Sequence, residues 1–301
     1  TGTFMTACSN SWIGMWMGME INLLSIIPLL TTQNNKMESE AAMKYFIVQA
    51  LSSTIFLMTM IMNSSILTKM GAAPFHFWLP EIMEGLNWVN SMIMLTMQKI
   101  APMIVLMNTN KSASLMAMVI LASALVSGIQ GLNQTSMKKI MAWSSINHNG
   151  WMIGAMLTNQ TIWLLYFVIY SMTSINIMMV MNEMKINNIM QLATKINNKN
   201  IKIFFAMNFM SMAGMPPLMG FFPKWITINL MSKSNTMTTT MLIILTLMTI
   251  FFYIRISMNS MTLNTEENTN KKIKETMFWT MMTNSTVITS LMMTPLMTIF
   301  F

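Results

Sequence analysis

The chain has 301 residues, of which 54% are apolar and only 9% charged, and its net charge is +8. So little charge excludes a soluble globular protein of this size, and long apolar runs that recur from end to end predict a multi-span membrane protein. The runs lack the alternating ten-residue pattern of a membrane barrel, so we expect an all-α fold. Cys8 is the single cysteine, which excludes an internal disulfide and a cysteine metal site.

Apolar segments of about 20 residues, long enough to cross roughly 30 Å of hydrocarbon, follow one another along the chain. We expect ten spans, near residues 11–31, 40–61, 62–80, 87–108, 112–132, 138–158, 160–182, 203–231, 236–258 and 276–301. Residues 1–10 are expected to be the tail of a further helix. Polar connectors separate most of these segments and none resembles a soluble domain. We therefore expect residues 1–301 to form a single transmembrane domain.

The lysines of the connectors predict an orientation. With ten alternating spans, one set of connectors carries ten lysines and the other carries two. The ten are Lys36, Lys138, Lys139, Lys185, Lys195, Lys199, Lys202, Lys271, Lys272 and Lys274; the two are Lys111 and Lys233. This asymmetry predicts that the lysine-rich connectors face the interior compartment and that both chain ends face the other side.

Several ionisable residues fall inside the apolar spans, where a charge is costly and indicates function. Glu20 is the only charge before Lys36, and a carboxylate there must be protonated or paired. Lys99 lies mid-span, too deep to reach water easily. For both residues function is favoured over a hydrogen-bonded structural role. Lys224 is also favoured as functional, although an interfacial position remains an alternative.

The segment LTKMGAAPFHFW, residues 67–78, combines Lys69 with a broken helix. Pro74 has no N–H, so the carbonyl of Met70 loses its helical donor, and Gly71 relaxes the chain at the same place. We expect the freed carbonyl and the negative end of the half-helix to lie beside Lys69 and to favour its charge, while burial opposes it. A lysine between these effects can change protonation when a neighbouring charge changes, so function is favoured most strongly here.

A second broken span follows in GMPPLMGFFPKW, where Gly214, Pro216 and Pro217 interrupt the helix. The two prolines free the carbonyls of Met212 and Ala213. Two interrupted spans in separate parts of a chain are typical of a transporter core built from repeats, and irregular backbone at that depth must be buried or line a wet cavity. A pair of static kinks is the alternative.

The remaining polar residues carry weaker signals. Lys44 is expected to form an i,i+4 surface pair with Glu40, and Arg255 is expected to extend to the membrane interface. His76 and His148 are isolated, which makes a metal or haem site improbable on sequence grounds. His148 in SSINHNGW is a candidate polar relay, with a satisfied polar cluster at a helix start equally favoured. The chain has no aspartate for a catalytic triad and no glycine fingerprint for a dinucleotide.

Six segments carry a family resemblance, and they occur in the order SWIGMWMGMEINLLSIIPLL, ESEAAMKYF, KMGAAPFHFWLPE, MQKIAP, GLNQTSMKKIMAWSSINHNGW and GMPPLMGFFPKW. Together they closely resemble the NADH dehydrogenase subunit 2 family of mitochondrial respiratory complex I, in its arthropod form. The 45 methionines further indicate an animal mitochondrial gene in which ATA is read as Met. The resemblance covers nearly the whole chain.

The resemblance implies an antiporter-like membrane-arm subunit with two inverted five-helix repeats, each containing a discontinuous helix. It implies a proton-translocating axis in which Glu20 pairs with Lys69, followed by Lys99 and Lys224. It also implies no cofactor in this chain, since flavin, iron–sulfur clusters and quinone belong to other subunits. The expected partners are neighbouring antiporter-like, small core and accessory subunits and phospholipids, with no nucleic acid. The expected location is the mitochondrial inner membrane, with the lysine-rich loops in the matrix.

Two departures from the family pattern accompany the resemblance. The family's first helix is expected to be largely absent, and the stretch 40–68 is expected to be shortened. The working hypothesis is proton translocation coupled electrostatically to quinone reduction elsewhere in the complex. A free-standing secondary antiporter and a purely structural subunit are the alternatives.

Overall fold

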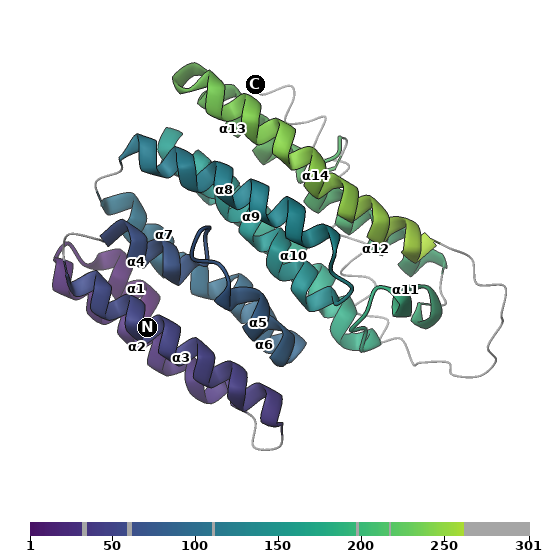
Figure 1. Cartoon of the computed structure of the whole chain (residues 1–301), viewed down its shortest axis with the longest axis horizontal. Coiled ribbons are helices and arrows are strands. Elements are labelled where there is room, and N and C mark those ends of the chain that lie inside the picture. The colour runs from purple at the N-terminus through teal and green to yellow at the C-terminus, as the bar shows by residue number, and fades with distance from the viewer. Residues whose placement is uncertain (32–34, 59–61, 110–111, 197–198, 217, 262–301) are drawn as a thin grey trace.

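The computed structural model describes residues 1–31, 35–58, 62–109, 112–196, 199–216 and 218–261 (Figure 1). Over these ranges the chain is helical, with short turns and one isolated bridge between Ser136 and Asn188, so the predicted all-α fold is confirmed. The expected span 276–301 and Pro217 lie outside the described residues, as do Lys111, Lys271, Lys272 and Lys274.

The first three helices are α1 (Gly2–Cys8), α2 (Trp12–Leu30) and α3 (Lys36–Leu57). Ser11 caps α2 by accepting a hydrogen bond from the backbone N–H of Gly14. Helices α1 and α2 pack closely because Gly2 and Gly18 face each other, and a Cβ on either would lie 2.6 Å from an atom of the other helix. Within residues 1–10, where the tail of a helix was predicted, Gly2–Cys8 therefore form a helix beside α2.

The predicted span 62–80 is divided into α4 (Met62–Met70) and α5 (Trp78–Gly85), which are separated by the irregular residues 71–77. Gly71 has φ +68°, a left-handed conformation that residues with a side chain rarely adopt. The predicted span 87–108 is also divided, into α6 (Trp88–Leu95) and α7 (Met97–Asn108). Its interruption at Thr96 lies three residues before Lys99.

The next helices are α8 (Ala113–Leu132), α9 (Met137–Thr158) and α10 (Gln160–Met184). Figure 1 shows α9 in the middle of the molecule, beside α8 and α10. Every residue of α9 from Ile140 to Met156 is buried. Small residues permit this packing, because a Cβ on Gly150 would lie 2.2 Å from the Ser123 hydroxyl of α8.

The last described helices are α11 (Met190–Lys195), α12 (Lys199–Ala213), α13 (Phe221–Ser234) and α14 (Thr236–Met261). Helices α12 and α13 are the two halves of the second broken span, and Gly214 between them has φ +80°. Both predicted breaks therefore exist, each with a left-handed glycine directly after the first half-helix.

Five described segments are long and apolar enough to cross a membrane: Trp12–Leu30, Trp88–Asn108, Ala113–Leu132, Gln160–Met184 and Thr236–Met261. The two connectors that follow α8 and α10 pair along their backbones, since the N–H of Met137 donates to the Asn187 carbonyl at 2.8 Å. Lys138 and Lys185, which the sequence assigned to one set of connectors, consequently lie at the same end of the molecule.

Arg255 of α14 binds the end of a neighbouring helix. Its guanidinium donates through Nη1 to the Leu132 carbonyl at 2.6 Å and through Nη2 to the Gln134 carbonyl at 3.0 Å. The last carbonyls of α8 have no helical donors and carry the negative end of the helix dipole. Arg255 therefore caps α8, and its extension to the membrane interface stays a prediction.

Candidate functional site

The first break is closed by side chains from other segments. The Nδ2 of Asn149, on α9, donates to the Met70 carbonyl at 2.9 Å, and the indole N–H of Trp78 donates to the Thr68 carbonyl at 2.9 Å. The carbonyl that Pro74 was predicted to free is thus occupied by an amide. The Lys69 amine, which was expected beside this carbonyl, does not bind it. Packing of α9 against the end of α4 places the neutral Asn149 amide there instead.

Lys69 is buried, with 8% of its surface exposed, and its Nζ has no hydrogen-bond partner among the described residues. Glu20 on α2 is near enough to attract the lysine charge, but within the described ranges no ion pair of 4.0 Å or less joins the two side chains. The Oε1 of Glu20 is buried and likewise has no partner among these residues. The structure therefore shows these two groups near each other and out of direct contact.

A cavity of about 20 Å³ lies beside Lys69, and Lys99 lines the same cavity. This volume is enough for about one water molecule. Its polar lining also includes Asn22, Gln49, Tyr45 and Gln98. Gln98 exchanges two hydrogen bonds of 3.3 Å with Asn22 and accepts one of 3.0 Å from the Tyr45 hydroxyl. The first two lysines thus line one small cavity, whose wall is partly polar and partly apolar.

Lys99 continues the chain of polar contacts toward α9 and α10. Its Nζ, 2% exposed as a residue, donates to the Ser145 carbonyl at 3.3 Å and to the Tyr170 hydroxyl at 3.5 Å. The amine also lies 5.1 Å from the centre of the Tyr170 ring, within the range of a cation–π contact. The lysine amine therefore binds a backbone carbonyl, a hydroxyl and an aromatic ring inside the bundle.

His148 lies between the two later lysines. Its Nδ1 is 2.9 Å from the Tyr166 hydroxyl, and its ring is 4.9 Å from the Tyr170 ring that also contacts Lys99. The histidine interacts electrostatically with both Lys99 and Lys224. It is in the middle of α9, so the alternative of a polar cluster at a helix start places it wrongly.

The second break differs from the first in its donor. Lys224 of α13 donates to the Met212 carbonyl at 3.2 Å and to the Ala213 carbonyl at 2.8 Å. These are the two carbonyls that Pro216 and Pro217 were predicted to release from the helix. Lys224 is only 6% exposed and its amine lies 5.8 Å from the Trp151 ring, so its side chain is enclosed by the bundle.

A family model, named relatives and solved structures all match this chain. A family model described as "NADH:quinone oxidoreductase/Mrp antiporter, TM" matches residues 9–65 and 58–252. NADH-ubiquinone oxidoreductase chain 2 of Anopheles gambiae is 43% identical over 292 residues, which covers 89% of this chain and 85% of the relative. The Locusta migratoria protein of the same name is 39% identical, with coverage of 89% and 84%. This chain belongs to the NADH-ubiquinone oxidoreductase chain 2 family.

Two solved structures share the fold of this chain 2 family member. A chain of respiratory complex I from Thermus thermophilus with bound aureothin has a TM-score of 0.86 at 20% identity, covering 96% of this chain and 74% of that one. A chain of the Mrp complex from Dietzia sp. has a TM-score of 0.80 at 14% identity, covering 90% and 60%. The family resemblance inferred from the motifs is therefore confirmed, as is an antiporter-like, multi-pass membrane fold.

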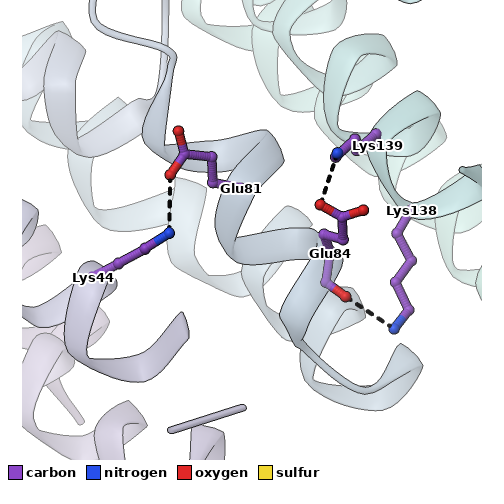
Figure 2. A network of polar contacts seen from close by, with 5 residues as sticks. All are labelled: Lys44, Glu81, Glu84, Lys138 and Lys139. Atoms are coloured by element: carbon purple, nitrogen blue, oxygen red, sulfur yellow. Dashed lines mark hydrogen bonds and ion pairs between the residues drawn. The ribbon is translucent and has the colours of Figure 1, made fainter. Parts of the chain in front are cut away.

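Charged contacts surround α5 in this chain 2 family member (Figure 2). Lys44 pairs with Glu81 of α5 at 3.2 Å, so the expected pair with Glu40 is wrong: α3 packs beside α5 and brings an acid across from Lys44. On the other side, Figure 2 shows Lys139 of α9 paired with Glu84, at 2.7 Å, and Lys138 donating to the Glu84 carbonyl, at 3.4 Å. Lys138 also donates to the Leu86 carbonyl at 2.6 Å.

Sequence reasoning missed the uncharged polar members of the site. These are Asn22, Tyr45, Gln98, Asn149, Tyr166 and Tyr170. Two weak signals were present, because Gln98 and Asn149 directly adjoin Lys99 and His148, and Tyr166 and Tyr170 share one face of α10 at i,i+4 spacing. Neither signal distinguishes a site residue from an ordinary packed side chain.

Proposed function

We propose that the chain is a membrane-arm subunit of the proton-pumping NADH:ubiquinone oxidoreductase of the mitochondrial inner membrane. Its role is to translocate protons through an axis of Glu20, Lys69, Lys99 and Lys224, with His148 as a relay between the last two. Electron transfer through flavin, iron–sulfur clusters and quinone takes place in other subunits. The lysine-rich connectors face the matrix, and neighbouring complex I subunits and phospholipids cover the apolar surfaces.

One observation carries this proposal: buried polar contacts run through an otherwise apolar molecule. Lys69 and Lys99 share one cavity, and Tyr170 contacts both Lys99 and the His148 ring. Ionisable groups inside a membrane are costly, so the presence of four of them in one helical bundle favours a proton path over four unrelated structural roles.

The coupling between these sites is electrostatic. Two charges 4 Å apart at an effective dielectric near 20 interact by about 4 kcal/mol, which corresponds to roughly 3 pKa units and suffices to load or empty a site. Glu20 and Lys69 stand farther apart than this in the structure, so a movement that closes the pair would strengthen their attraction. Each change of charge then alters the proton affinity of the next site, and the set titrates as one coupled system.

The decisive experiment is Lys69→Met in assembled complex I. Purified complex in proteoliposomes should pump fewer than half as many protons per NADH oxidised, since the first switchable charge is removed. Lys44→Met is the matched control, because it removes a lysine whose side chain is 56% exposed and paired at the surface. Unchanged pumping per NADH in Lys69→Met would contradict the proposed axis.

The two alternatives make different predictions. The fold is also similar to that of an Mrp complex chain, so a free-standing antiporter is an alternative. Such an antiporter would purify in active form without a redox complex. A purely structural subunit would tolerate apolar replacements of Glu20, Lys69, Lys99 and Lys224 with pumping retained. Identity of 43% with chain 2 of Anopheles gambiae favours assembly into the redox complex.

A further inference from the structure

Helix α9 contacts the first broken span on both sides of its break. Asn149 binds the Met70 carbonyl at the end of α4, while Lys138 and Lys139 bind Leu86 and Glu84 at the end of α5. The geometry points to Asn149 as a positioning residue for Lys69: it fixes the end of α4, and with it the place of the lysine amine relative to Glu20. This inference rests on the proposed function.

The hydrogen bond from Asn149 fixes the position of the last residue of α4. Met70 is the last residue of that helix, and both it and Asn149 are almost completely buried. Among the described residues, the Asn149 amide is the only donor that reaches the Met70 carbonyl. A buried carbonyl without a donor is unfavourable, so the amide selects one position for the helix end. Lys69, the preceding residue, takes its position from that end.

Helix α9 also positions Lys99 and His148. The Ser145 carbonyl, one turn before Asn149, accepts the bond from Lys99, and His148 is the neighbouring residue in the chain. Burial of the helix from Ile140 to Met156 leaves it little room to move. Through Asn149, the position of Lys69 therefore depends on α9, the same rigid helix that binds Lys99 and contains His148.

The far half of the span is held to the same helix by charge. Figure 2 shows Lys138 directed at the backbone of Glu84 and Lys139 directed at its carboxylate. The Trp78 indole of α5 also binds α4, at the Thr68 carbonyl, so loss of the Asn149 bond is expected to shift mainly the last residues of α4, Lys69 and Met70. Attraction between Glu20 and Lys69 depends on their separation, so such a shift changes the proton affinity of Lys69.

Asn147 provides a matched control on the same helix. It is as completely buried as Asn149, and its Nδ2 donates to the Thr249 hydroxyl of α14 at 3.3 Å. Replacing either asparagine by leucine removes one buried amide of equal size from α9. The two variants differ in what they release, because only Asn149 binds a helix break.

The test compares Asn149→Leu with Asn147→Leu in assembled complex I in proteoliposomes. Protons pumped per NADH oxidised are measured across a series of pH values. Release of the end of α4 changes the attraction between Glu20 and Lys69, so the pH midpoint of pumping should shift, and pumping per NADH should fall at least twofold. Asn147→Leu should keep the wild-type midpoint, since a general loss of packing lowers the amount of complex and leaves the midpoint in place.

Equal pH midpoints for wild type and Asn149→Leu would overturn the inference, as would an equal shift in Asn147→Leu. If either leucine variant fails to assemble, Asn149→Ser and Asn147→Ser replace the pair, because a smaller side chain avoids overpacking; the same two results support or overturn the inference. Lys69→Met separates the two levels. Unchanged pumping in Lys69→Met contradicts the proposed function itself, whereas loss in Lys69→Met with a wild-type profile in Asn149→Leu contradicts only the role of Asn149.

Discussion

The two broken spans contain the same kinds of residue, but different donors bind the backbone carbonyls that each break releases. Each has a left-handed glycine after its first half-helix, a proline shortly beyond it and a buried lysine. At the second break Lys224 itself binds the released carbonyls of Met212 and Ala213. At the first break Asn149 binds the released carbonyl, and the Lys69 amine has no partner among the described residues.

This difference separates a lysine that is bound to the backbone from one that is not. Two backbone carbonyls hold the Lys224 amine in one place and favour its charged form, while burial opposes that charge. Lys69 lacks that support, so its charge depends on how closely Glu20 approaches. We therefore expect the first half of the molecule to respond to changes in a neighbouring charge, and the second half to keep its lysine amine in one position.

The largest expected effect contrasts the stability of Lys224→Met with that of Lys69→Met. Lys224→Met leaves two buried carbonyls without donors, at about 1–3 kcal/mol each, whereas Lys69→Met removes an amine with no partner and should be neutral or slightly stabilising. Thermal unfolding of purified complex I should show a clearly lower midpoint for Lys224→Met alone. Equal midpoints would mean that the two breaks do not differ in the way described.

A second contrast uses the glycines. Alanine at either position meets backbone strain of about 1–2 kcal/mol. A Cβ on Gly214 would also lie 2.8 Å from the Lys224 Cδ and 3.0 Å from its Nζ, while a Cβ on Gly71 would approach nothing closer than Trp78, at 3.3 Å. Gly214→Ala should therefore lower both pumping per NADH and the thermal midpoint more than Gly71→Ala. The reverse order would show that Lys224 moves aside freely.

The smallest expected effect concerns the ion pair of Lys44, on the outside of the first broken span. Its lysine and glutamate side chains are 56% and 60% exposed, so the pair contributes about 0–1 kcal/mol and is screened by salt. Lys44→Met should leave pumping per NADH unchanged and lower the thermal midpoint slightly, with a smaller difference at high salt. A loss of pumping here would assign the surface pair a role in the switch.

The sequence predicted the features that single residues determine. Apolar length predicted the five described segments that are long and apolar enough to cross a membrane, and glycine with proline predicted where two further segments are interrupted. Costly buried charge identified Lys69, Lys99 and Lys224 as unusual, and the structure places all three inside the molecule. Their roles in proton transfer, and that of Glu20, stay predictions.

Features that depend on neighbouring helices were beyond sequence reasoning. The partner of Lys44 is on α5 because two helices pack there, whereas local spacing pointed to Glu40. The donor at the first break could not be identified from the sequence either. A polar side chain in a buried helix often bonds its own backbone, as Ser145 does with the Ala142 carbonyl at 2.8 Å. Only packing shows that Asn149 binds a different helix.

The complete burial of α9 has a consequence for how this sequence can change over time. Most helices of the chain have a side on which one apolar residue can replace another without meeting a neighbour. Between Ile140 and Met156, α9 has no such side, since every residue there is enclosed. Random substitution should therefore be tolerated least in this stretch, and a survey of natural variants should find it the slowest part of the chain to drift.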